Sequence, residues 1–314
     1  MDLSTIRSHP TQFISMTSLD ISEFSILLEY FEIRCNDYFM RYTYRGKLRK
    51  HLMFKEPKTS TLFGSEMKLF FLLTYMKNYP LQQFQASYFV LSQSKVSEWI
   101  KILTPILQMS LKDMGLLPSM DANTLKLELE KYQIKEVNMD ATEREINRSS
   151  DYSTQKEFYS GKKKKHTVKN NLIAEPSQYI LYLSQTYEGC VHDKKICDIE
   201  QYQFPDNLLL RYDLGYLGYI PENTRIEVPH KKTKRNPLSD KMKAENKEIS
   251  TKRVSIEQAI SGVKRLKIVA DKIRIFNREF RHQVMIIAAA IHNLRVRSNK
   301  RAYTCGRISL NFHP

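Results

Sequence analysis

Three acidic residues stand where the sequence predicts regular structure. Residues 134–140 and 208–213 are each typical of an apolar strand that ends in an aspartate, and Glu257 lies on a helix expected over residues 252–266. Carboxylate oxygens are ligands that Mg²⁺ prefers. Two such ions, about 3.5–4 Å apart, can clamp the attacking and leaving oxygens of an in-line displacement. Asp140, Asp213 and Glu257 therefore indicate metal-assisted phosphoryl transfer.

The helix that carries Glu257 has an apolar stripe with charged residues beside it. At about 100° per residue, Arg253, Glu257 and Lys264 fall within roughly 40° of one another. One carboxylate between two cations is thus aimed at the edge of a core. In an isolated helix this pattern is typical of a surface ion-pair stripe, so the assignment depends on the rest of the chain.

Other acids compete for two of the three positions. Asp193 is a rival of Asp213, but it suits the cap of a helix, whereas Asp213 ends an apolar strand. Glu245 and Glu248 are rivals of Glu257, but they lie in a lysine-rich polar run without an apolar face. The sequence favours Asp213 and Glu257 and leaves Asp193 open as an alternative.

Charge is the strongest global signal in the chain. The 314 residues contain 50 Lys and Arg against 34 Asp and Glu, a net charge of +16. Such a field favours a polyanion as partner. A membrane is not expected, because the longest apolar run, residues 284–291, is far too short for a span. The N-terminus lacks the layout of a signal peptide. We therefore expect a soluble protein that is not secreted.

Several other classes of protein find no support. Four cysteines make no disulfide framework in a chain of this length. Cys190, His192 and Cys197 match no familiar zinc-finger spacing and have no second ligand pair. No GxGxxG or GxxxxGK[ST] pattern occurs, which argues against a dinucleotide or P-loop enzyme.

The segment before the acids is expected to be helical. Residues 1–60 form one helical region, and residues 61–132 show helices near 66–75, after Pro80 and over 95–103, with a polar turn at 92–94. This layout is typical of a helix-turn-helix domain, although a plain three-helix bundle would look similar. The residues expected to contact DNA are small, polar or basic: Gln93, Ser94, Lys95, Ser97 and Lys101.

The acids are spread over an alternation of strands and helices. Strands are expected at residues 134–140, 162–174, 179–184 and 208–213, with a helix opening near Asp193 and the Glu257 helix last, which predicts a mixed α/β layer. Lysines open the second strand and are expected to face DNA: Lys162, Lys163, Lys164 and Lys165. A closing helix over residues 276–297 and a tail over 298–314 complete the chain.

The motifs follow one another in a specific order. They run Asp140-Ala-Thr-Glu, Tyr159-Ser-Gly-Lys-Lys-Lys-Lys-His-Thr-Val-Lys169, Val191-His-Asp193, Asp213-Leu-Gly-Tyr-Leu-Gly218 and then the Glu257 helix. This string resembles the DDE transposases of bacterial insertion sequences, in the branch that is similar to Harbinger-type elements. The resemblance covers roughly residues 134–295, and the helix-turn-helix before it also resembles the family's N-terminal module.

The resemblance implies an RNase H-like catalytic core. Its three acids map to Asp140, Asp213 and Glu257, which would hold Mg²⁺, with Mn²⁺ as a substitute. The related Tyr-Arg-Glu-Lys signature implies that Arg253 steadies Glu257 or the DNA backbone and that Lys264 contacts a phosphate. The chain departs from that signature at Ser250, which stands in the tyrosine position.

The expected fold is α+β or mixed α/β, with residues 1–60 as a helical region, 61–132 as the helix-turn-helix domain, 133–297 as the RNase H-like domain and 298–314 as the tail. The expected function is a DNA transposase. It would bind the terminal inverted repeats of an insertion sequence, cut the ends and join them to target DNA, as a homodimer in the DNA complex. Two alternatives stay open: a DNA-binding regulator without catalysis, and a nuclease that cuts without joining.

Overall fold

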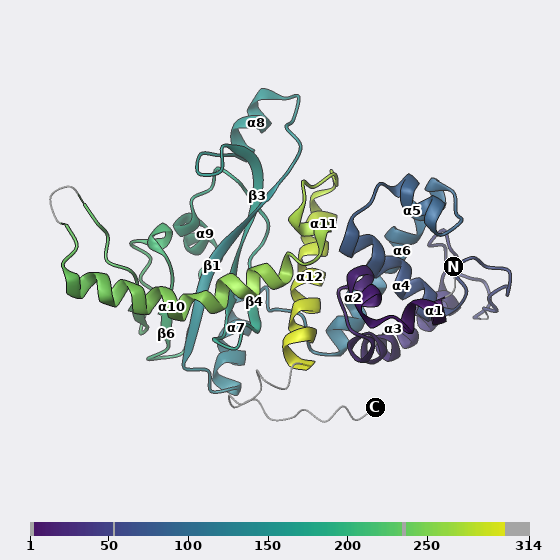
Figure 1. The fold of residues 1–314 in the computed structure, drawn as a ribbon, viewed down its shortest axis with the longest axis horizontal. Coiled ribbons are helices and arrows are strands. Elements are labelled where there is room, and N and C mark those ends of the chain that lie inside the picture. The colour runs from purple at the N-terminus through teal and green to yellow at the C-terminus, as the bar shows by residue number, and fades with distance from the viewer. Residues whose placement is uncertain (1–2, 53, 234–236, 299–314) are drawn as a thin grey trace. The chain divides into compact units, whose positions relative to one another are not determined.

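The computed structural model describes residues 3–52, 54–233 and 237–298 (Figure 1). The described residues fold as two compact units. Unit 1 contains residues 3–117, 264–271 and 277–295, and unit 2 contains residues 118–263, 272–276 and 296–298. The expected tail lies outside the described residues, apart from its first residue. No helix in the described ranges is long and apolar enough to cross a membrane.

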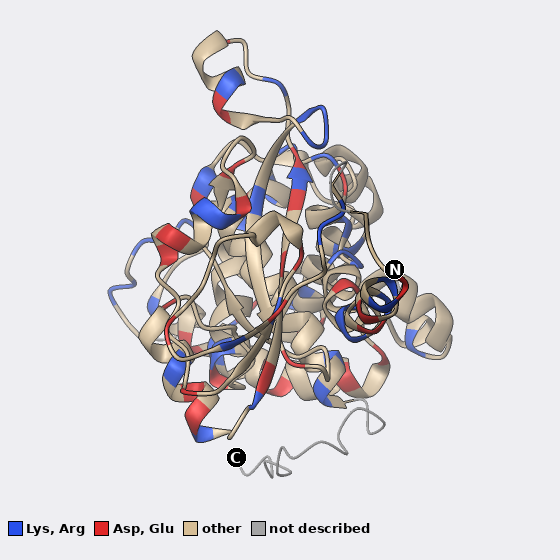
Figure 2. Cartoon of the chain, turned by 90° about the vertical axis from the view of Figure 1, so that its left-hand side faces the viewer, with Lys and Arg blue, Asp and Glu red and all other residues tan. Residues whose placement is uncertain are grey.

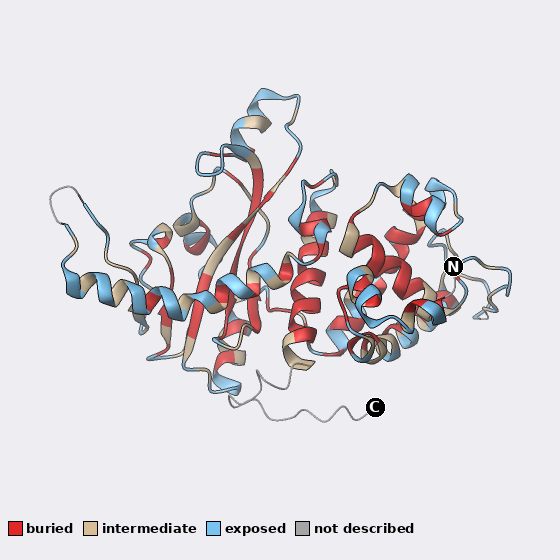
Figure 3. Cartoon of the chain, viewed as in Figure 1, coloured by how far each residue is buried: buried red, intermediate tan, exposed pale blue. Residues whose placement is uncertain are grey.

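The regular elements of unit 1 among the described residues are helices, and one isolated bridge joins Tyr42 to Leu48. The helices are α1 (Leu3–Arg7), α2 (Pro10–Thr17), α3 (Ile21–Arg41), α4 (Gly64–Asn78), α5 (Gln82–Tyr88), α6 (Gln93–Asp113), α11 (Lys267–Ala270) and most of α12 (Arg278–Ser298). Helix α3 begins at a capping box in which Asp20 accepts from the Glu23 amide. Figure 3 shows α4 and α12 as largely buried. The closing helix packs in unit 1, where Asn293 donates to the Leu116 carbonyl.

The expected three helices at residues 66–103 exist, with different ends. Helix α6 begins at Gln93 and continues through Pro105 to Asp113. Ser92 caps this helix by accepting from the Lys95 amide, so residues 93 and 94 lie in its first turn and the connection from α5 covers residues 89–92. The tryptophan of α6, Trp99, is buried, as expected.

Unit 2 is a mixed sheet with helices. Its strands are β1 (Glu136–Glu145), β2 (Tyr159–Ser160), β3 (Lys165–Ala174), β4 (Ile180–Leu183), β5 (Tyr187–Glu188), β6 (Leu209–Arg211) and β7 (Arg225–Glu227). Its helices are α7 (Ala122–Lys131), α8 (Tyr152–Phe158), α9 (Asp193–Glu200), the 3₁₀ turn η1 (Leu214–Tyr216) and α10 (Asp240–Val263). Asp121 caps α7 by accepting from the Thr124 amide, as expected.

The sheet has the order β2-β3-β1-β6-β7, and β4 and β5 also pair with β3. Strand β3 is antiparallel to β1, whereas β6 is parallel to β1 and β7 is parallel to β6. This α+β architecture with a mixed sheet is compatible with an RNase H-like domain. The expected mixed α/β class is therefore confirmed, while the helix-turn-helix assignment stays a prediction.

Different elements pack against the two faces of the sheet. Side chains alternate along a strand, so Val137 and Met139 point to one face and Asn138 and Asp140 to the other. The first face carries the apolar core of unit 2, which includes residues of α7 and α9. The second face meets α10, where Asn138 donates to Ser255 Oγ at 2.8 Å.

A buried arginine joins the three parallel strands. Arg211 of β6 is 4% exposed and donates to Glu136 Oε2 of β1 at 2.8 Å and to Glu227 of β7. Both carboxylates together balance a charge that would be costly to bury alone. The contact fixes β6 against β1 two residues before Asp213.

Candidate active site

Asp140 lies in the middle of β1, so the expectation that the strand ends there is wrong. Strand β1 continues to Glu145 because it stays paired with β3 as far as the Glu145–Thr167 pair. Asp140 is opposite Leu172 of β3. Its side chain is 21% exposed, and its Oδ1 accepts from the Ala141 amide at 2.8 Å.

The parallel pairing of β1 and β6 brings the first two candidate acids together. Its last pair joins Asn138 and Arg211. Two residues further along both strands, the same register leads to Asp140 and Asp213. Strand β6 ends at Arg211, and Asp213 caps η1 by accepting from the Gly215 amide at 2.8 Å. The negative charge of Asp213 contributes to raising the pKa of Asp140, which agrees with their proximity.

The third candidate acid lies on α10, which is much longer than the helix expected from the sequence. Its buried residues in the region of Glu257 are Ile249, Ile256, Ala259 and Val263. Arg253 and Ser255 lie on opposite flanks of this stripe: Ser255 meets Asn138, and Arg253 approaches Asp140. Glu257 is about 40° from Arg253 around the helix. It therefore lies on the same side of α10 as Arg253, with its side chain exposed. In the described residues, the structure does not bring Glu257 into a group of three acids with Asp140 and Asp213.

Two expectations about this helix need correction. Lys264 lies one residue beyond the end of α10, so it is not on the regular helix with Glu257. The rivals Glu245 and Glu248 belong to the same helix as Glu257. Glu245 contacts His230 at 2.7 Å and Glu248 contacts Lys252 at 2.7 Å.

The environment of Asp140 disfavours its charged form. The pKa of Asp140 is raised from 3.8 to about 6, chiefly by burial and in smaller part by the Asp213 charge, although Arg253, the Ala141 amide and Lys162 act to lower it. The cation is present but not in hydrogen-bond contact, because Arg253 Nη2 is 3.8 Å from Asp140 Oδ2. Arg253 Nε is buried and has no hydrogen-bond partner among the residues that the structure describes.

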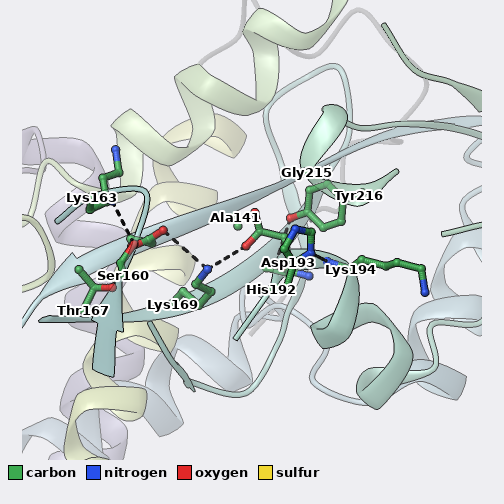
Figure 4. Close-up of polar contacts among 12 residues, drawn as sticks. Ala141, Ser160, Lys163, Thr167, Lys169, His192, Asp193, Lys194, Gly215 and Tyr216 are labelled. Carbon is green, nitrogen blue, oxygen red and sulfur yellow. Dashed lines mark hydrogen bonds and ion pairs between the residues drawn. The ribbon is translucent and has the colours of Figure 1, made fainter. Parts of the chain in front are cut away.

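The rival acid Asp193 has a different environment. It is the first residue of α9, and His192 provides the helix cap, so the expected capping role of Asp193 is wrong. Its Oδ1 is 3.0 Å from Nζ of Lys169, which is 5% exposed (Figure 4). Lys169 Nζ is also 3.6 Å from Glu143 Oε1. Asp193 thus shares a buried ammonium with Glu143, whereas Asp213 accepts from the neutral amide of Gly215.

Asp140 and Asp213, two oxygen donors of the right chemistry for a hard cation, are therefore close enough to interact electrostatically. In the described ranges, no group of three or more His, Cys, Asp or Glu side chains is arranged to hold a metal ion. The Asp140 and Asp213 oxygens nevertheless fit Mg²⁺ or Mn²⁺, because Mg²⁺ takes few protein carboxylates and keeps several waters. Burial is the main cause of the raised pKa of Asp140, and a bound cation would favour the charged form that burial disfavours.

The lysines expected to face DNA lie mostly in a turn instead of a strand. Residues 161–164 connect β2 to β3, and Lys164 has a positive φ of 55°. Lys165 is the first residue of β3, and its Nζ is 2.6 Å from Glu145 Oε2. Lys162, Lys163 and Lys164 are exposed and form a blue loop near the top of Figure 2.

The residues expected to read DNA through unit 1 lie at the start of α6. Gln93, Ser94, Lys95 and Lys101 are exposed and Ser97 is partly buried. Lys95 forms an exposed ion pair with Glu98 at 2.7 Å, which offsets part of its charge. The first turn of α6 is therefore accessible, as contact with a major groove would require.

The comparisons with known proteins concern the part of the chain that carries these acids. Residues 139–293 match the family described as DDE superfamily endonuclease. This part of the chain belongs to that family. A stretch of 150 residues is also 29% identical to "Probable transposase for insertion sequence element IS702" of Microchaete diplosiphon, over 48% of this chain and 54% of that protein. The chain thus matches about half the length of this relative. No solved structure matches the chain.

Sequence reasoning missed the buried cluster around Lys169 of the DDE domain. Thr167 Oγ1 donates to Glu143 Oε2 at 2.8 Å, and Lys169 joins Glu143 to Asp193. A signal was present, because Thr167, Lys169 and Asn171 alternate along β3 and so share one face. Which acids this lysine meets depends on the pairing with β1 and on α9.

The pKa of Asp140 predicts a stability change for Asp140→Asn. Below pH 3.8 the carboxyl is protonated in both states, so its burial costs little charge energy; above about pH 6 the full cost applies, because the native pKa is the higher one. Without metal, Asn should raise the free energy of unfolding at pH 8 by up to about 3 kcal/mol. The gain should fall to about 0.5 kcal/mol at pH 4 and vanish below about pH 3.

Denaturant titrations at both pH values measure this difference. Asp198→Asn, which removes one carboxylate from the exposed side of α9, is the matched control and should stay within about 0.5 kcal/mol. An equal gain for Asp140→Asn at pH 4 and pH 8 would contradict the electrostatic origin.

Proposed function

We propose that the chain is a transposase of a bacterial insertion sequence, from the branch similar to Harbinger-type elements. The observation that carries the proposal is the adjacency of Asp140 and Asp213 within a DDE superfamily endonuclease domain. The similarity to a probable transposase of the IS702 element supports the same proposal. The substrate would be double-stranded DNA: the terminal inverted repeats of the element and the target.

The three acids would bind the metal from different elements of the fold. Asp140 and Asp213 would hold Mg²⁺, or Mn²⁺ in its place, and Glu257 would complete the set from α10. Bound there, the metal would polarise the scissile phosphate and lower the pKa of an attacking water. Arg253, whose Nε is buried without a partner among the described residues, would balance charge beside Asp140 and steady the reacting backbone. Lys264 would contact a phosphate near the element end.

The DNA would be bound by two regions. The start of α6, with Gln93, Ser94, Lys95, Ser97 and Lys101, would read the inverted repeats as a helix-turn-helix. Lys162, Lys163, Lys164 and Lys165 would hold the backbone near the acids. Because two ends must be cut and joined, the protein would act as a homodimer on DNA, in the cytoplasm of a prokaryote and associated with the nucleoid.

The first prediction concerns cleavage and joining. On a labelled duplex that carries the element's own ends, wild type should cut and join in Mg²⁺. Asp140→Asn, Asp213→Asn and Glu257→Gln should each lose more than about 100-fold, which exceeds the usual loss for a residue that only supports a ligand. Glu248→Gln is the matched control on α10 and should keep wild-type rates.

Each other outcome selects a different function. Cutting without joining would favour the nuclease alternative. Binding of the ends without cutting in Mg²⁺ or Mn²⁺ would favour the DNA-binding regulator. An active Asp213→Asn with an inactive Asp193→Asn would keep the function and exclude Asp213 as the second acid.

The second prediction concerns the salt dependence of DNA binding. The logarithm of the association constant should fall linearly with the logarithm of salt concentration, by about 0.9 per neutralised phosphate. Replacing Lys162, Lys163 and Lys164 with Ala should reduce that slope by about one for each phosphate that these lysines neutralise. Anisotropy titrations on a labelled duplex between about 50 and 200 mM salt measure it.

The matched control removes three other exposed lysines, Lys112, Lys131 and Lys135. If this control lowers the slope as much as the loop variant does, the effect reflects net charge alone and the lysine loop does not bind DNA.

A further inference from the structure

A buried ion cluster lies on the face of the sheet opposite α10. Glu143 of β1 is paired directly with Lys169 of β3, so their side chains share that face. Lys169 Nζ lies 3.0 Å from Asp193 Oδ1 and 3.6 Å from Glu143 Oε1, and Thr167 supports Glu143 by a hydrogen bond (Figure 4). The Lys169 and Glu143 side chains are only 7% and 9% exposed.

The cluster also touches the turn that carries Asp213. A Cβ atom added to Gly215 would lie 2.9 Å from Asp213 Oδ1 and 3.1 Å from Asp193 Oδ2. A side chain at residue 215 would therefore displace one or both carboxylates. The Gly215 amide in turn donates to Asp213 Oδ1 at 2.8 Å. The Asp193 carboxylate therefore lies beside Gly215, in the turn that carries Asp213.

We propose that Lys169 and Asp193 are positioning residues that hold Asp213 in place for metal binding. The proposal rests on the proposed function, because it takes Asp213 as a metal ligand. Lys169 anchors the Asp193 carboxylate, Asp193 packs against Gly215, and Gly215 orients the Asp213 side chain through its amide. Because the Asp193 carboxylate is paired with Lys169, this acid supports the site without being a metal ligand.

The alternative role for Asp193 is a direct ligand, and the two roles predict different responses. A ligand binds better when a competing cation is removed, so Lys169→Met should then leave metal affinity intact or raise it. A positioning pair loses its effect when either partner is removed. Partners that orient a ligand usually contribute about 10–100-fold to metal affinity.

The test is a titration of the full chain with Mn²⁺, in which electron paramagnetic resonance measures the free ion. Asp193→Asn and Lys169→Met should each weaken binding by about 10–100-fold. The double variant should be no weaker than the weaker single variant, because both changes break one pair. Gly215→Ala, which alters no charge, should weaken binding to a similar extent. Asp198→Asn, on the same helix, should bind as wild type does.

Thermal melts show whether each variant is folded. If Lys169→Met does not fold, Gly215→Ala still tests the proposal. Affinities within twofold of wild type for Asp193→Asn and Gly215→Ala would overturn the proposal. Loss of binding in Asp193→Asn with unchanged or tighter binding in Lys169→Met would also overturn it, in favour of a ligand. Asp213→Asn tests the metal site separately from the positioning role of Lys169 and Asp193. If this variant binds Mn²⁺ as tightly as wild type does, or if wild type does not bind Mn²⁺, the proposed metal site itself is wrong.

Discussion

The site depends on two carboxylates that follow the parallel pairing of β1 and β6 and are close enough to interact electrostatically. Asp140 and Asp213 follow the Asn138–Arg211 pair by two residues on each strand. Their mutual repulsion and the burial of Asp140 disfavour its charged form, which appears as a pKa of about 6. A fold keeps such an arrangement only if other contacts hold it, and Arg211 supplies one by joining three strands just before the acids.

The acids on the two faces of the sheet differ in their distance from the nearest cation. On the α10 face, Arg253 stays 3.8 Å from Asp140 and beyond hydrogen-bond distance. On the opposite face, Lys169 closes directly on Asp193 at 3.0 Å. A cation thus contacts Asp193 directly on one face, whereas on the other face the nearest cation stays outside hydrogen-bond distance of Asp140. This difference supports Asp213 over Asp193 as the second acid, on physical grounds that are independent of motif order.

The sequence allowed much of the site to be anticipated, because its strands and the Glu257 helix have clear apolar periodicity. It could not place Asp140 within its strand, since the extension of β1 to Glu145 depends on pairing with β3, which local pattern does not encode. The length of α10 was missed because its first half is polar and has little apolar stripe. The packing of α12 with unit 1 was equally hidden, because a buried stripe does not say which partner covers it.

The central claim is that Asp140 and Asp213 together hold a divalent cation. Crystals of the protein soaked in Mn²⁺, with the anomalous scattering of manganese measured, test it most directly. The account predicts an anomalous peak about 2 Å from oxygens of both Asp140 and Asp213. A peak against Asp193 and Glu143, or none beside Asp140 at saturating Mn²⁺, would contradict it.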